Sequence, residues 1–202
     1  IQHLIFASTS SVYGDNKKFP TKESFNTDLP LSFYAATKKS NEVMAHSYSE
    51  IYKLKCTGLR FFTVYGPYGR PDMSLFKFTK AIFENKTIDL FNSGNHTRDF
   101  TFVDDIVESI KKIIENKKNN KKIYNIYNIG NGRPVNLKTF IKIIEKFTGK
   151  QLKYRNLDIQ KGDVIKTHAD ISKLIKEIDY EPQTKIEHGI KSFLDWYKGF
   201  YK

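Results

Sequence analysis

The chain has 202 residues, of which 39% are hydrophobic, and this is enough for one good core or for one domain and part of another. Lysine and arginine number 34 against 22 acidic residues, but only five are arginines, which favours a solvated lysine surface over a nucleic-acid site. One cysteine, Cys56, excludes an intrachain disulfide, and no apolar run approaches the ~18 residues of a membrane span, so we expect a soluble, cytoplasmic protein without a membrane partner.

Strands and helices are predicted to alternate along the chain. Apolar runs predict the strands, and apolar residues at helical spacing predict the helices, with Ser32 and Asn136 as N-caps. In chain order these are strand 3–9, loop 15–32, helix 32–54, strand 56–66, loop 67–73, helix 74–86, strand and turn 87–94, helix 102–116, a Lys/Asn-rich surface loop, strand 123–130, helix 136–150, strand 151–157, and helices 170–180 and 185–201.

This alternation predicts an α/β architecture with parallel strands. A dinucleotide-binding unit of this class carries a G-x-G-x-x-G turn between its first strand and helix. The one approximate match, "GNG" at 130–132, lies far downstream and is interpreted as a plain strand-to-helix turn without a phosphate role. The chain starts at Ile1 and almost directly with an apolar strand, so we expect an N-terminally truncated chain.

Tyr34 and Lys38 form the most informative pair of residues. They lie four residues apart in the helix predicted at 32–54, so they face the same side, one turn apart. A neighbouring ammonium group favours the phenolate form of a tyrosine, and such a pair can remove a proton from an alcohol. The Y-x-x-x-K spacing is common by chance, and its alternative interpretation is a packed tyrosine beside a solvated lysine.

Further motifs accompany this pair in a fixed order. "ASTSSVYG" (7–14) precedes "YAATKK" (34–39), and "LRFFTVYGP" (59–67), "RDFTFVDDI" (98–106), "YNIGNGRPV" (127–135) and "GDVIKTHADISK" (162–173) follow. Together they resemble the extended short-chain dehydrogenase/reductase family, the NAD-dependent nucleotide-sugar epimerases and dehydratases. The resemblance implies the C-terminal part of a Rossmann-like parallel sheet with helices, plus a smaller α/β substrate-binding domain.

The resemblance also implies the catalytic residues. Tyr34 matches the catalytic base, and Lys38 matches the lysine that holds the nicotinamide ribose of NAD and tunes the tyrosine. Thr9 stands where the family keeps a Ser or Thr that hydrogen-bonds the reacting sugar hydroxyl. Ser11 is a second candidate near the sugar.

Further residues are implied to bind the cofactor or the UDP-sugar. Phe62 and Val64 match a segment beside the nicotinamide, and Thr63 matches its contact with the sugar. Arg98 matches an arginine on the diphosphate, for which a planar guanidinium is well suited. Asp163 matches an acid near the nucleotide ribose. The five histidines are scattered without ligand spacing, so no metal site is expected.

Two features distinguish activities within the family. The related dehydratases and decarboxylating enzymes keep carboxylates after the threonine, where this chain has Ser10 and Ser11, so an epimerase acting at C4 is expected. Among the epimerases, "GPYGRPDM" (66–73) together with "SFYAATKKSNEVMAHSYS" (32–49) most resembles the UDP-glucuronate 4-epimerases. Arg70 in this segment is then expected near the C6 carboxylate, while a surface loop arginine is the equally weighted alternative.

The expected organisation follows from the same resemblance. Residues 1–66 are predicted to be the C-terminal portion of the NAD-binding domain, and residues 67–202 mainly the substrate domain, with some elements returning to the first sheet. This chain alone is expected to be inactive, and a homodimer through a helix bundle is expected. The alternatives are another nucleotide-sugar dehydratase or reductase of this family, and a non-catalytic basic binding module.

Overall fold

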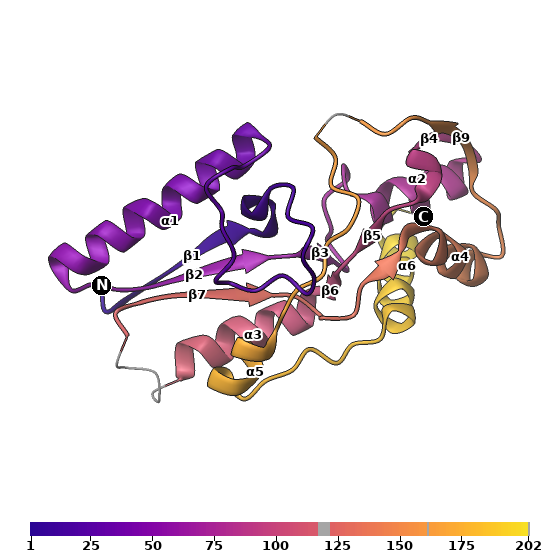
Figure 1. Cartoon of the computed structure of the whole chain (residues 1–202). Helices are drawn as coiled ribbons and strands as arrows, with labels where there is room; N and C mark the ends of the chain where they lie inside the picture. The colour runs from indigo at the N-terminus through magenta and orange to yellow at the C-terminus, as the bar shows by residue number, and fades with distance from the viewer. Residues whose placement is uncertain (117–121, 161, 202) are drawn as a thin grey trace.

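The computed structural model describes residues 1–116, 122–160 and 162–201. Its largest sheet is parallel, in the order β1-β2-β7, and the predicted α/β class is confirmed. The strands are β1 (His3–Thr9), β2 (Lys55–Phe61) and β7 (Tyr124–Ile129). Helix α1 (Phe33–Tyr52) covers one face of this sheet, and α3 (Val103–Glu115) and α5 (Ser172–Ile178) lie on the other (Figure 1).

Helix α1 begins and ends for local reasons. The Ser32 hydroxyl accepts the N–H of Ala35 at 3.1 Å, which is the predicted N-cap, and Lys53 adopts a left-handed conformation that ends the helix. The residues of one stripe are buried: Ala35, Glu42, Ala45 and Ser49. Another stripe exposes large apolar side chains: Val43, Met44, Tyr48, Ile51 and Tyr52.

Three small two-stranded sheets lie beyond the carboxyl ends of the large sheet (Figure 1). They pair β3 (Thr63–Tyr65) with β6 (Phe100–Phe102), β4 (Thr87–Phe91) with β9 (Lys153–Leu157), and β5 (Thr97–Arg98) with β8 (Val135–Asn136). The helices of this region are α2 (Ser74–Glu84), α4 (Leu137–Thr148) and α6 (Ile186–Tyr201), and short 3₁₀ helices occur at η1 (Ser10–Tyr13) and η2 (Asn92–Gly94). Asn136 caps α4 as predicted, accepting the N–H of Lys138 at 2.9 Å.

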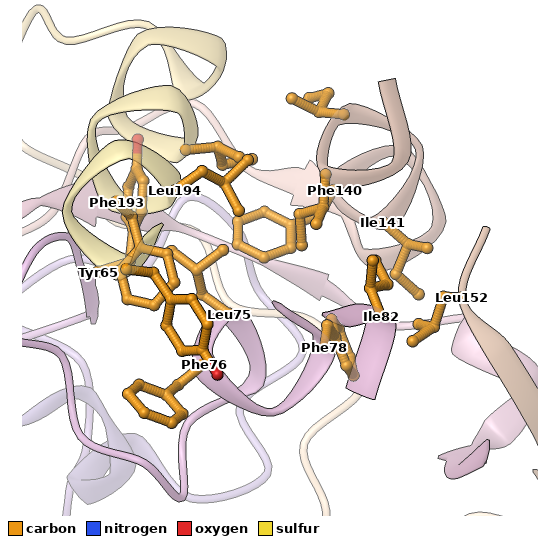
Figure 2. Packing of buried hydrophobic residues seen from close by; sticks show 14 of the residues in the cluster. Tyr65, Leu75, Phe76, Phe78, Ile82, Phe140, Ile141, Leu152, Phe193 and Leu194 are labelled. Atoms are coloured by element: carbon orange, nitrogen blue, oxygen red, sulfur yellow. The ribbon is translucent and has the colours of Figure 1, made fainter. Parts of the chain in front are cut away.

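The buried apolar side chains form two clusters. One lies beneath the large sheet and includes Leu59, Ile113 and Leu174. The other is rich in aromatic residues and joins β3, α2, α4 and α6; Figure 2 shows Tyr65, Phe76 and Phe193 within it.

The prediction of a single strand at 56–66 is wrong in one respect, because this segment contributes to two different sheets. The N–H of Phe62 donates to the carbonyl of Ile129 at 2.9 Å, whereas the N–H of Thr63 donates to the carbonyl of Asp99 at 3.0 Å. The segment therefore divides into β2 and β3. The short strands β5, β6 and β8 were not predicted, since two or three residues give no alternating pattern.

The arrangement in space bears on the predicted domain boundary at residue 66. β7 pairs with β2, and α5 lies on the same sheet, so segments after residue 66 accompany β1 and β2. The boundary itself stays a prediction. The surface loop predicted within 117–121 lies outside the described residues. None of the helices in the described ranges is long and apolar enough to cross a membrane.

Candidate active site

Two adjoining cavities lie at the carboxyl ends of β1 and β2, the position at which open parallel sheets bind ligands. The larger, of about 650 Å³, contains Thr9, Tyr34 and Arg70 in its wall. The smaller, of about 250 Å³, contains Arg98 and Asp163. Four residues line both cavities and so join them into one cleft: Ser10, Ser11, Phe62 and Thr63.

The turn after β1 presents its hydroxyl groups to this cleft. Thr9 Oγ1 accepts the N–H of Ser11 at 3.2 Å, so Thr9 caps the 3₁₀ helix η1, and its hydroxyl also donates to Ser11 Oγ at 3.2 Å. The turn closes at Gly14, which has φ of +58° and whose position would bring a Cβ atom within 2.4 Å of the Leu29 carbonyl oxygen. Glycine is therefore required there.

Tyr34 and Lys38 lie in the first two turns of α1, as predicted. Tyr34 is 55% exposed and lines the larger cavity. Lys38 Nζ donates to the carbonyl of Ala7 at 3.2 Å and lies 5.9 Å from the centroid of the Tyr34 ring. This bond anchors the ammonium group to β1 at Ala7, a residue that lines the same cavity as Tyr34.

A buried ion pair supports the turn from below. Arg60 Nε and Nη2 donate to the two carboxylate oxygens of Glu42, each at 2.8 Å, and Ser8 donates to the same carboxylate at 2.6 Å. Arg60 Nη1 also donates to Tyr13 Oη at 2.9 Å, and Tyr13 donates to Asn128 Oδ1 at 2.6 Å. This network binds α1 and β2 to the turn that holds Thr9.

The electrostatics of this network follow from its burial. Burial alone raises the pKa of Glu42, but the hydrogen bonds and charge of Arg60, with the hydroxyl of Ser8, outweigh burial and lower the pKa. Burial raises the pKa of Tyr13 to about 12, although Arg60 opposes the rise. Sequence reasoning missed Glu42; the available signal was a carboxylate in a stripe of α1 whose other members are small.

Arg70 lies in the loop after β3 and lines the same cavity as Tyr34 and Thr9. Its guanidinium is exposed and binds Asp72 through two hydrogen bonds, Nε–Oδ1 at 3.0 Å and Nη2–Oδ2 at 2.6 Å. The hydrogen bonds and charge of Asp72 raise the pKa of Arg70, and nearby Tyr34 acts in the same direction. The cavity that contains Tyr34, the predicted base, therefore also contains the cation of Arg70.

Arg98 and Asp163 meet in the smaller cavity, where they bind each other. Arg98 Nη2 donates to Asp163 Oδ1 at 2.9 Å, and Arg98 Nη1 donates to the carbonyls of Thr97 and Ile165. Asp163 Oδ2 also lies 2.9 Å from Nε2 of the buried His96. Burial lowers the pKa of Arg98, and the charge and hydrogen bond of Asp163 oppose this.

Asp99 is a second residue that sequence reasoning missed. Its buried carboxylate accepts the N–H groups of Asn131, Gly132 and Ala169 at 2.8–3.1 Å. Two of these N–H groups belong to the "GNG" turn, for which no phosphate role was predicted. Asp99 thereby ties β6 to this turn and to the segment that carries Asp163.

The predicted site residues are thus distributed over one cleft. The larger cavity includes Thr9, Ser11, Tyr34, Phe62, Thr63, Val64 and Arg70, and the smaller includes Ser11, Phe62, Thr63, Arg98 and Asp163. Lys38 is not among the residues that line either cavity, and its link to the cleft is the hydrogen bond to Ala7, which lines the larger one. In the described part of the chain, no cluster of three or more His, Cys, Asp and Glu residues has the arrangement of a metal site. The roles of the individual residues stay predictions.

Comparison with known proteins gives three findings. Residues 1–130 match the family described as "NAD dependent epimerase/dehydratase family". The chain is 51% identical to Protein CapI of Staphylococcus aureus and 43% identical to a probable UDP-glucuronate 4-epimerase of Rhizobium meliloti, with all of this chain aligned to 65% and 63% of those proteins. A crystal structure of UDP-glucuronic acid 4-epimerase from Bacillus cereus, in complex with UDP-glucuronic acid and NAD, matches with a TM-score of 0.92 at 35% identity, covering 98% of this chain and 62% of that one. The chain therefore spans just under two thirds of the length of these proteins.

Proposed function

The chain belongs to the NAD dependent epimerase/dehydratase family, and from this premise we propose that the protein epimerises C4 of a UDP-sugar, converting UDP-glucuronate to UDP-galacturonate. The observation that carries the proposal is the placement of cations in the cleft. Arg70 stands in the cavity of Tyr34 and Thr9, and Arg98 stands in the adjoining cavity. UDP-glucuronate has two anionic groups, a sugar carboxylate and a diphosphate, and the two cavities offer one guanidinium to each.

The proposed chemistry assigns one task to each residue near Tyr34. The phenolate oxygen of Tyr34 removes the proton of the 4-hydroxyl and later returns it. Lys38, held by Ala7, keeps its positive charge beside that phenol. The hydroxyl of Thr9 hydrogen-bonds the same sugar oxygen and orients it toward Tyr34.

The part of the NAD site that this chain contributes borders the same cavity. When bound, NAD supplies the hydride acceptor and donor for C4. We propose that Lys38, Phe62 and Val64 hold its nicotinamide end, since Phe62 and Val64 line the cavity of Tyr34. Ser10 and Ser11 also face this cleft and offer no carboxylate for the elimination of water, which favours epimerisation over dehydration.

The test compares two sugars in the complete protein. Arg70→Met is expected to lower kcat/KM for UDP-glucuronate by about 10- to 100-fold, the range for losing hydrogen bonds to a charged group, and to leave UDP-glucose unchanged. The matched control is Arg133→Met, since Arg133 is also an exposed arginine paired with a carboxylate, Glu181, but lies outside the cleft. Equal losses for both sugars in Arg70→Met would make Arg70 a structural residue and remove the support for an acidic sugar.

A further inference from the structure

Lys166 lines the smaller cavity beside Arg98, and none of the functions described above involves it. Fifteen described residues line this cavity, and among them Arg98 and Lys166 are the two with positive charge and Asp163 is the one carboxylate. The formal charges of Arg98 and Asp163 cancel, so the net positive charge of these described lining residues comes from Lys166.

Most hydrogen-bond donors of Arg98 are already occupied, so Arg98 alone is a weak binding partner for a ligand with two negative charges. Both donors that its Nη1 offers point to the carbonyls of Thr97 and Ile165, at 3.3 and 3.1 Å, and Nη2 is bound to Asp163 at 2.9 Å. A diphosphate entering here also meets the like charge of Asp163. A second cation is therefore needed to make the cavity attractive to a diphosphate.

The backbone fixes Lys166 next to Arg98. Thr97 donates to the carbonyl of Ile165 at 2.9 Å and accepts the N–H of Thr167 at 3.0 Å, so Lys166 lies between two hydrogen bonds to the neighbour of Arg98. The opposite wall is tied to the same segment, because Thr21 donates to the carbonyl of His168 at 2.8 Å.

The side chain of Lys166 is held by an aromatic ring across the cavity. Its Nζ lies 4.8 Å from the centroid of the Phe19 ring, and Phe19 also lines the cavity. Such a contact is weak at an exposed site, but it restricts the rotamers of a long side chain and reduces the entropy lost on binding. Within the described residues, the ion pairs found do not include Lys166, so its ammonium group keeps its donors for a ligand.

We propose that Lys166 is a second diphosphate-binding residue of this cleft, positioned by Phe19. The inference rests on the proposed function only in requiring a ligand with a diphosphate, and the identity of the sugar does not enter. Lys166 supplies a compact point charge with three donors, Arg98 supplies a planar guanidinium, and the two positive charges together match the charge of the diphosphate.

The experiment measures the affinities of UDP and uridine by calorimetry in the complete protein. Lys166→Gln is expected to lower the affinity for UDP roughly tenfold and to leave the affinity for uridine unchanged, because uridine lacks the phosphates. Lys166→Arg keeps the charge and is expected to restore most of the affinity for UDP. Phe19→Leu is expected to lower the affinity for UDP severalfold, since it removes the ring that positions Lys166 without removing the charge of Lys166.

Lys18→Gln is the matched control, because Lys18 is an exposed lysine next to Phe19 that does not line the cavity. An unchanged ratio of UDP to uridine affinity in Lys166→Gln, or an equal loss in Lys18→Gln, overturns the proposal. Unaltered uridine binding shows that the variant is folded. A protein that passes this test but prefers UDP-glucose to UDP-glucuronate would refute the proposed sugar and leave the role of Lys166 intact.

Discussion

We expect Arg60→Met to lower the free energy of unfolding by about 3–5 kcal/mol, because it leaves a buried carboxylate without its cation. The side chains of Arg60 and Glu42 are 5% and 4% exposed, so water does not replace the lost partner. Of the donors that now reach Glu42, only the hydroxyl of Ser8 remains. This loss is a large part of the ~5–15 kcal/mol that stabilises a typical domain.

A second variant separates the cost of the unpaired buried charge from the cost of lost packing. In Glu42→Leu/Arg60→Met no charge remains buried, so we expect a cost of about 1–2 kcal/mol, mainly from the unpaired hydroxyl of Ser8. Urea unfolding followed by circular dichroism measures both variants, with the exposed Arg133→Met as a control within about 0.5 kcal/mol of the parent. A double variant no more stable than Arg60→Met, or a single-variant loss below about 1 kcal/mol, would refute the reasoning.

The same ion pair predicts a dependence of stability on pH. The pKa of Glu42 is lowered in the folded protein from an ordinary value of 4.5. A group with a lowered folded pKa adds stability that is fully present above its unfolded pKa and is lost as the pH falls through the folded pKa. Stability should therefore decline below about pH 4.5, and in Glu42→Gln this decline should be shallower.

Two further predictions concern α1. Tyr34→Phe is expected to lower kcat by about 10²–10⁴-fold with little change in the affinity for UDP-sugar, because the phenol acts on the proton in transfer. The control Tyr48→Phe, on the same helix, should retain activity. Near-normal turnover in Tyr34→Phe would exclude proton transfer by this residue. The second prediction is that the exposed apolar stripe of α1 is the interface of a homodimer. Met44→Glu should then shift the sedimentation coefficient toward that of a monomer, whereas the control Lys142→Glu on α4 should not. A parent protein that is already monomeric would refute this interface.

The elements that the sequence predicted well are those with local determinants. The helix predicted at 32–54 is α1, since its N-cap at Ser32 and its apolar spacing act within one or two turns. The break at Phe62 depends on the distant partners Ile129 and Asp99, which no local pattern reveals. The same reason explains why the two-residue strands β5 and β8 were missed.

The candidate site shows the same limit. Tyr34 and Lys38 were paired from spacing alone, because one helical turn fixes their relation. The resemblance to the family suggested Arg98 and Asp163, but their mutual ion pair joins residues 65 positions apart. Glu42 and Arg60 lie on different elements, and their contact follows only from the packing of α1 on β2.

Both arginines of the cleft already bind a carboxylate of this chain, and this determines how sugar selectivity arises. A neutral sugar leaves the pair of Arg70 and Asp72 intact, so it leaves no unpaired charge and suffers no penalty. We propose that an acidic sugar exchanges the carboxylate of Asp72 for its own at Arg70, and that water excluded by the bound sugar strengthens this interaction. The proposed partner of Arg98 is the diphosphate, which every UDP-sugar carries, so its contribution would be common to all of them. The choice of sugar should therefore depend on Arg70 and its neighbours, and the affinity for the nucleotide on Arg98 and Lys166.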